Sequence, residues 1–93
     1  MDKLIHIGFG NIVNTAKIIA IVGPDSAPVK RLVQKAKEEG RVIDATQGRK
    51  TKAVLVMENS QVVLSALLPE TIAGRAQADL EGYAEKQEQN IEE

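Results

Sequence analysis

The ten residues from Asp44 to Ala53 read Asp-Ala-Thr-Gln-Gly-Arg-Lys-Thr-Lys-Ala and place three cations within four positions. A short strand-like run, Arg-Val-Ile, precedes them at residues 41–43 and a longer apolar run follows at residues 53–57, as expected of two buried strands. Gly48 permits a tight turn between the two runs. The segment therefore predicts a cationic loop or hairpin that is held by two strands, which is a rigid way to present positive charge to a polyanion.

The residues around this segment predict a small α+β domain. After a turn at residues 58–61, a strand at residues 62–67 pairs back on the strand at 53–57 as a hairpin. The remaining expected elements are strands at residues 3–7, 12–13, 17–22 and 42–44, a central helix at 27–39, and a C-terminal helix that starts at Pro69. The order β-β-β-α-β-β-β-α predicts a mostly antiparallel or mixed sheet.

The central helix carries local start and stop signals. Ser26 or Asp25 is a suitable N-cap, Pro28 fits the first turn, and Gly40 suits the position after the last turn. One helix face is apolar, and the exposed side is basic, with Lys30, Arg31, Lys35 and Lys37. A basic helix face either follows a phosphate backbone or is simply solvated, and Arg31 is a candidate for the first role.

The strand at residues 17–22 is almost continuously apolar. This pattern predicts either a strand in the middle of a sheet or a strand at a subunit interface, where Ile19 and Ile21 would be buried. Its apolar run is far too short to cross a bilayer, and the N-terminus lacks the pattern of a signal peptide. We expect no membrane partner and a cytoplasmic, nucleoid-associated protein.

Composition restricts the possible functions. The 93 residues contain no Cys, which excludes disulfides, thiolate metal sites and Cys nucleophiles, and only 2% are aromatic. Such a low aromatic content disfavours a binder of single-stranded RNA, which needs stacking residues. We expect one domain at residues 1–80 and an acidic, disordered tail at residues 81–93.

Charge is distributed unevenly along the chain. Residues 1–52 hold ten Lys and Arg and five Asp and Glu, a net charge of +5, whereas residues 53–93 have a net charge of −6 from two cations and eight carboxylates. A basic body with an acidic tail is typical of proteins that meet nucleic acid.

No catalytic set is recognisable. Gly8-Phe9-Gly10 follows a strand but precedes another strand, so it predicts a tight turn and not a nucleotide loop. His6 has no Ser, Cys or second His at a useful spacing, and Asp44 is expected to form a turn or to pair with a cation. We therefore expect no enzyme activity, no cofactor and no metal site.

The cationic segment itself leaves two interpretations open. Arg49 offers a planar fork for phosphate or guanine, Lys50 and Lys52 offer point charges, and Thr51 adds a hydroxyl donor. The same residues would also form an ordinary solvated basic turn.

The chain resembles the RemA-type extracellular-matrix regulators, a family of small bacterial proteins. The matching segments extend over residues 4–75, and they comprise Ile7–Asn11, Ile18–Val22, Ser26–Arg31, Ile43–Thr46, Gly48–Val54, Leu64–Ala66 and Pro69–Ala73. The resemblance implies a DNA-binding transcriptional regulator that activates biofilm-matrix operons. It also implies a ring-shaped homo-oligomer of about seven or eight subunits, with double-stranded DNA as its partner.

The resemblance also implies roles for particular residues. The family's paired arginines fall on Arg49 and Lys50, a basic residue before the apolar strand falls on Lys17, and Pro28 would serve packing or assembly. Lys17, Lys50 and Lys52 stand where the family has arginines, and Gln47 replaces an aromatic residue. These changes keep the charge and lose the bidentate geometry of arginine. The alternative function is an oligomeric structural or protein-interaction module without DNA binding.

Overall fold

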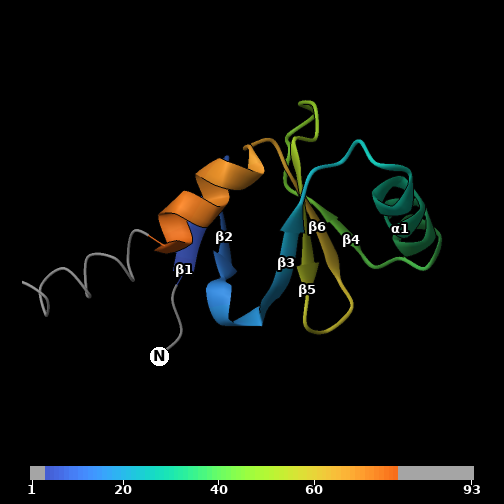
Figure 1. Cartoon of the computed structure of the whole chain (residues 1–93), viewed down its shortest axis with the longest axis horizontal. Helices are drawn as coiled ribbons and strands as arrows, with labels where there is room; N and C mark the ends of the chain where they lie inside the picture. The colour runs from blue at the N-terminus through green and yellow to red at the C-terminus, as the bar shows by residue number, and fades with distance from the viewer. Residues whose placement is uncertain (1–3, 78–93) are drawn as a thin grey trace, which may run out of the picture.

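The computed structural model describes residues 4–77 and confirms the predicted α+β class and element order (Figure 1). The elements are β1 (Leu4–Gly8), β2 (Asn11–Asn14), the 3-10 helix η1 (Thr15–Lys17), β3 (Ile18–Val22), α1 (Ala27–Glu38), β4 (Val42–Asp44), β5 (Ala53–Met57) and β6 (Val62–Ser65). A second helix occupies residues 69–77 and begins at Pro69, as predicted. The expected tail at residues 81–93 lies outside the described residues.

The strands form two sheets. β1 and β2 make an antiparallel hairpin, and the larger sheet has the order β3-β5-β6-β4. In the larger sheet β4 and β6 run parallel, whereas β5 is antiparallel to both β3 and β6. The predicted β5–β6 hairpin is therefore confirmed. β6 lies inside the sheet and its residues are buried on both faces, which accounts for the three consecutive apolar residues with which it begins.

β3 lies at an edge of the larger sheet, so the prediction that it occupies the middle is wrong. In the described sheet β3 pairs with β5 alone, and its register shifts between Ile18 and Ala20. The side chain of Ile19 is 66% exposed as a result. An apolar run indicates that a strand is buried, but it does not show what buries it. It cannot by itself distinguish a central strand from an edge strand that another surface covers. The alternative, a subunit interface, stays a prediction.

The larger sheet separates two apolar cores. α1 covers one face, where Ala36 packs with Val54, Val62 and Leu64. The β1–β2 hairpin and the second helix lie on the other side (Figure 1). There, Ile7 and Ile72 pack with Leu55 and Val63. Successive residues of β5 and β6 point to opposite faces, so the two strands supply both cores.

The ends of α1 follow the predicted signals. The Ser26 hydroxyl accepts a hydrogen bond from the Val29 amide at 3.3 Å, and Pro28 lies in the first turn. Gly40 has φ of 70°, and the Arg41 amide donates to the Ala36 carbonyl at 2.8 Å. This bonding closes the C-terminal turn as a Schellman motif. α1 thereby ends at a defined point and returns the chain into β4.

Candidate nucleic-acid interface

The predicted cationic segment is a loop, residues 45–52, that crosses the end of β6. β4 and β5 are not neighbours, because β6 lies between them. The loop is bound to β6 at both ends: the Ala45 amide donates to the Leu64 carbonyl at 2.9 Å, and the Lys52 amide donates to the Ser65 carbonyl at 2.8 Å. Of the two forms that the sequence predicts, the structure therefore has the loop and not the hairpin. We call residues 45–52 the cationic loop.

A tight turn lies inside the cationic loop. The Arg49 amide donates to the Thr46 carbonyl at 3.0 Å, and the two residues between them, Gln47 and Gly48, have φ of 55° and 77°. Positive φ at both central positions is the pattern of a type I′ turn. The turn that Gly48 predicts is thus confirmed, and it reverses the chain immediately before Arg49.

Asp44 organises the start of the loop. Its Oδ1 atom accepts hydrogen bonds from the Thr46 hydroxyl at 2.6 Å and from the Thr46 amide at 2.9 Å. These two bonds lower the pKa of the Asp44 carboxyl below its ordinary value, burial opposes them slightly, and the positive charge of Lys37 lowers the pKa further. Thr46 is only 2% exposed, so its hydroxyl depends on Asp44 as a protein partner. Asp44 acts here as a turn former.

The cations of the loop face solvent. Arg49, Lys50 and Lys52 are exposed, and Thr51 is half-buried. Within the described part of the chain the ion pairs involve Lys17 and Arg41, and neither pair includes a cation of the loop. Three positive charges are therefore presented without an ion-paired carboxylate from residues 4–77, which is the arrangement that an anionic partner requires.

α1 adds positive charge next to the loop. A hollow of about 270 Å³ lies between α1 and the loop, and its lining includes Lys30 and Lys37 of α1 together with Thr51. The α1 face beside the loop thus carries Lys30 and Lys37. Arg31, the α1 residue that the sequence singles out, is exposed but does not line this hollow.

Lys17 lies at the opposite end of β5 from the cationic loop. The Glu58 amide donates to the Lys17 carbonyl at 2.7 Å, and the two side chains form an exposed ion pair with Nζ and Oε2 3.8 Å apart. The six residue-to-residue steps of extended chain from Lys52 to Glu58 span roughly 20 Å. The structure therefore does not bring Lys17 together with Arg49 in one protomer.

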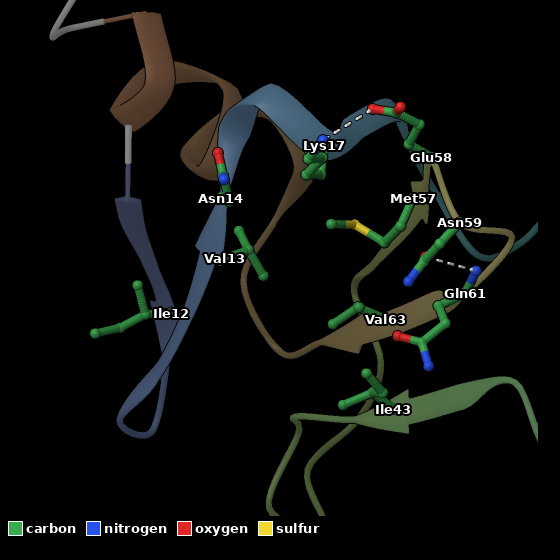
Figure 2. Close-up of a pocket in the computed structure, with 10 residues that line it drawn as sticks. All are labelled: Ile12, Val13, Asn14, Lys17, Ile43, Met57, Glu58, Asn59, Gln61 and Val63. Atoms are coloured by element: carbon green, nitrogen blue, oxygen red, sulfur yellow. Dashed lines mark hydrogen bonds and ion pairs between the residues drawn. The ribbon is translucent and has the colours of Figure 1, made fainter. Parts of the chain in front are cut away.

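Figure 2 shows a second hollow, of about 460 Å³, at the Lys17 end of the sheet. Its apolar lining residues are Ile12, Val13, Ile43, Met57 and Val63, and its uncharged polar lining residues are Asn14, Asn59 and Gln61. Its charged lining residues are the paired Lys17 and Glu58. An apolar hollow with one ion pair at its rim lacks converging acid–base groups, and no three His, Asp or Glu side chains of residues 4–77 are placed to hold a metal ion.

The predicted subunit-contact residues differ in exposure. Ile19 and Pro28 are exposed, whereas Ile21 is half-buried and packs against the core on the hairpin side. Ile12 and Ile43, at the edge of the apolar hollow, are 52% and 45% exposed. Ile19, Ile12 and Ile43 are therefore among the exposed apolar side chains of the described residues, which also include Leu4, Phe9 and Leu68.

The sequence does not indicate that two further residues, Phe9 and Asn11, lie next to the loop. The ring of Phe9 lies 5.5 Å from the guanidinium carbon of Arg49, and the Asn11 side chain donates to the Ala45 carbonyl at 3.4 Å. The tight turn predicted at Gly8-Phe9-Gly10 is confirmed between β1 and β2. No signal in the sequence shows that this turn lies against a loop about forty positions later, because the contact depends on how the two sheets pack.

Comparison with known proteins identifies relatives along most of the chain. Residues 4–76 match the RemA-like family, described as extracellular matrix regulatory protein A-like. A protein of Lachnoclostridium phytofermentans named "Putative regulatory protein" is 67% identical over 75 residues, which cover 81% of this chain and 82% of the relative. A relative of the same description from Geobacillus kaustophilus is 55% identical over 75 residues, 81% of this chain and 86% of the relative.

A relative from Thermoanaerobacter sp. (strain X514), which also carries the description of a regulatory protein, is 47% identical over 91 residues. That match covers 98% of this chain and 95% of the relative. Among the residues that the structure describes, no helix is both long and apolar enough to cross a membrane.

Proposed function

The chain belongs to the RemA-like family of regulatory proteins, and we propose that it regulates transcription by binding double-stranded DNA as a ring-shaped homo-oligomer. The observation that carries this proposal is the cationic loop, in which Arg49, Lys50 and Lys52 are exposed and free of ion pairs within the described residues. The family description supports regulation of extracellular-matrix genes as the biological setting.

The loop suits the DNA backbone for electrostatic reasons. Phosphate contacts by Lys and Arg release counterions and supply most sequence-independent affinity. The hydrogen bonds from Ala45 and Lys52 to β6 hold the loop in place, so little conformational entropy is lost when it binds. Lys30 and Lys37 extend the positive surface onto α1. Arg31 and Lys17 stay proposed DNA contacts, and Lys17 lies apart from the others.

Three loop cations make a weak binder, and a homo-oligomer overcomes this by repetition. Linking several equal sites raises the effective concentration of each site near the DNA. The exposed edge of β3, with Ile19, supports self-association, since an unpaired strand edge is a template for pairing with another chain. The apolar hollow with Ile12 and Ile43 supports it as well, since apolar side chains that gather on a surface mark interaction sites. Pro28 and Ile21 complete the residues proposed for assembly.

Replacement of Arg49 by Ala tests the proposal, with Lys35→Ala as the charge-matched control. Lys35 is an exposed α1 cation that does not line the hollow beside the loop. We expect Arg49→Ala to weaken binding of duplex DNA at least tenfold and to lower the salt slope by about 0.9 per contacting subunit. Light-scattering mass should stay that of the parent in both variants, and Lys35→Ala should bind nearly as the parent does.

Two results would contradict the proposal. Equal retardation of DNA by the parent and Arg49→Ala would show that the loop is not the contact surface. An assembled parent that retards no DNA at low salt would instead support an interaction module without DNA binding.

A further inference from the structure

The turn between β1 and β2 and the cationic loop form one connected unit. The Asn11 side-chain amide donates to the Gly8 carbonyl at 3.0 Å within the turn and to the Ala45 carbonyl at 3.4 Å in the loop. The buried Ser65 hydroxyl donates to the Ile7 carbonyl at 2.8 Å and so ties β1 to the end of β6. The turn and the loop are therefore held against the same end of β6.

Phe9 occupies this turn in a costly conformation. Its φ is 53°, and Gly8 and Gly10 on either side have φ of 104° and 78°. A bulky residue seldom adopts a positive φ, because its Cβ atom crowds the backbone. The Phe9 side chain is 48% exposed and lies outside both apolar cores, so core packing does not explain why an aromatic residue stands there.

The ring of Phe9 instead meets Arg49. The guanidinium carbon lies 5.5 Å from the ring centroid, which is within the range of a cation–π contact. No ion pair of the described residues involves Arg49, so the ring is its side-chain partner. A guanidinium group held over a ring loses rotational freedom and still has N–H donors for a phosphate or a base edge.

We propose that Phe9 is a positioning residue that holds the Arg49 guanidinium group ready for DNA, and that Asn11 keeps the turn beside the loop. This inference rests on the proposed DNA binding. Part of the cost of ordering Arg49 is then met before DNA arrives, which strengthens binding without a further contact to DNA. The strained conformation of Phe9 serves this arrangement, as strain often does at binding sites.

The test compares substitutions at Phe9 in three backgrounds. Phe9→Leu removes the π face and keeps an apolar side chain, whereas Phe9→Tyr retains the ring. For each contacting subunit, we expect Phe9→Leu to weaken duplex DNA binding roughly two- to fivefold, as expected for an exposed cation–π contact. Phe9→Tyr should bind as the parent does, and both variants should keep the parent's assembled mass.

The coupling between the two residues separates positioning from a general structural effect. In an Arg49→Ala background, Phe9→Leu should cause no further loss, because the group that the ring holds is already absent. In a Lys50→Ala background, the same substitution should cause its full loss. Equal loss in all three backgrounds, or equal weakening by Phe9→Tyr and Phe9→Leu, would overturn the inference.

The failure of the inference is distinguishable from the failure of the proposed function. If the Phe9→Leu variant binds duplex DNA as tightly as the parent does, the inference is wrong and the proposed function still stands. A parent that does not bind duplex DNA at low salt overturns both.

Discussion

Replacing Asp44 with Ala should destabilise the protein by about 2 kcal/mol, since a hydrogen bond to a charged acceptor contributes about 1.5–3 kcal/mol. The substitution removes both hydrogen bonds that Thr46 donates to Asp44, at 2.6 and 2.9 Å. It also leaves the buried Thr46 hydroxyl without its carboxylate partner. Because Asp44 itself is exposed, water replaces part of the loss, so the expected cost lies below the sum of the two hydrogen bonds.

Urea denaturation followed by circular dichroism measures this cost. With a slope of about 1–3 kcal/mol per molar urea, a change of this size moves the midpoint by roughly 0.7–2 M. All variants need the same protein concentration, because self-association would add to apparent stability. DNA affinity should fall as well, since the turn that precedes Arg49 begins at Thr46.

Thr46→Val is the matched control. It removes the hydroxyl at nearly constant volume. The double variant with Asp44→Ala should therefore lose clearly less free energy of unfolding than the two single variants lose in sum. A change below about 0.5 kcal/mol for Asp44→Ala, the range of an ordinary surface substitution, would refute the role assigned to Asp44.

Three further predictions concern the loop and the sheet edge. Gly48→Ala should lower the free energy of unfolding by about 1–2 kcal/mol in a thermal melt, and Gly48→Asn should lower it less. The φ of Gly48 is 77° and no atom of the described residues lies within 4 Å of an added Cβ, so the cost is that of the backbone alone; equal costs for the two variants would contradict this. Since the folded-state pKa of Asp44 is lowered, the stability that its carboxylate contributes should be complete above roughly pH 4 and disappear as the pH falls further. Asp44→Asn should therefore reduce the fall of the free energy of unfolding at acid pH, and an unchanged fall would count against this prediction. Ile19→Glu should lower the assembled mass in light scattering and leave the circular dichroism spectrum unchanged, because Ile19 is 66% exposed, and a parent-like mass would exclude the β3 edge from the interface.

The sequence predicts those parts of the fold whose signals are local. Ser26, Pro28 and Gly40 define the ends of α1 through neighbouring backbone groups, and the turn at residues 58–61 pairs β5 with β6. The strand order is less accessible. β6 enters between β4 and β5, and β4 joins it in parallel, which no short-range pattern specifies. Pairings between distant segments depend on the packing of the complete domain.

The candidate site shows the same division. Arg49, Lys50 and Lys52 adjoin in the sequence, so their shared loop could be predicted, as could its turn at Gly48. The contact of Phe9 with Arg49 depends on the docking of the β1–β2 hairpin, which the bond from Ser65 to β1 helps to define. Charge runs are visible in a sequence, whereas the neighbours that orient those charges come from the tertiary structure.

The separation of Lys17 from the cationic loop constrains how the proposed DNA binding can take place. A span of roughly 20 Å along β5 corresponds to about six base pairs of duplex, so one phosphate cannot meet Lys17 and Arg49 of the same protomer. Either the duplex runs along β5, or Lys17 of one subunit lies beside the cationic loop of the next.

The proposed ring, when built head to tail, favours the second arrangement, because it places unlike ends of neighbouring subunits together. The two arrangements differ in mixed assemblies. If the site is shared between subunits, a mixture of Lys17→Ala and Arg49→Ala chains forms some junctions with both cations intact and should bind DNA more tightly than either variant alone. If each protomer binds through its own two cations, no intact site forms, and the mixture should bind no better than the tighter of the two variants.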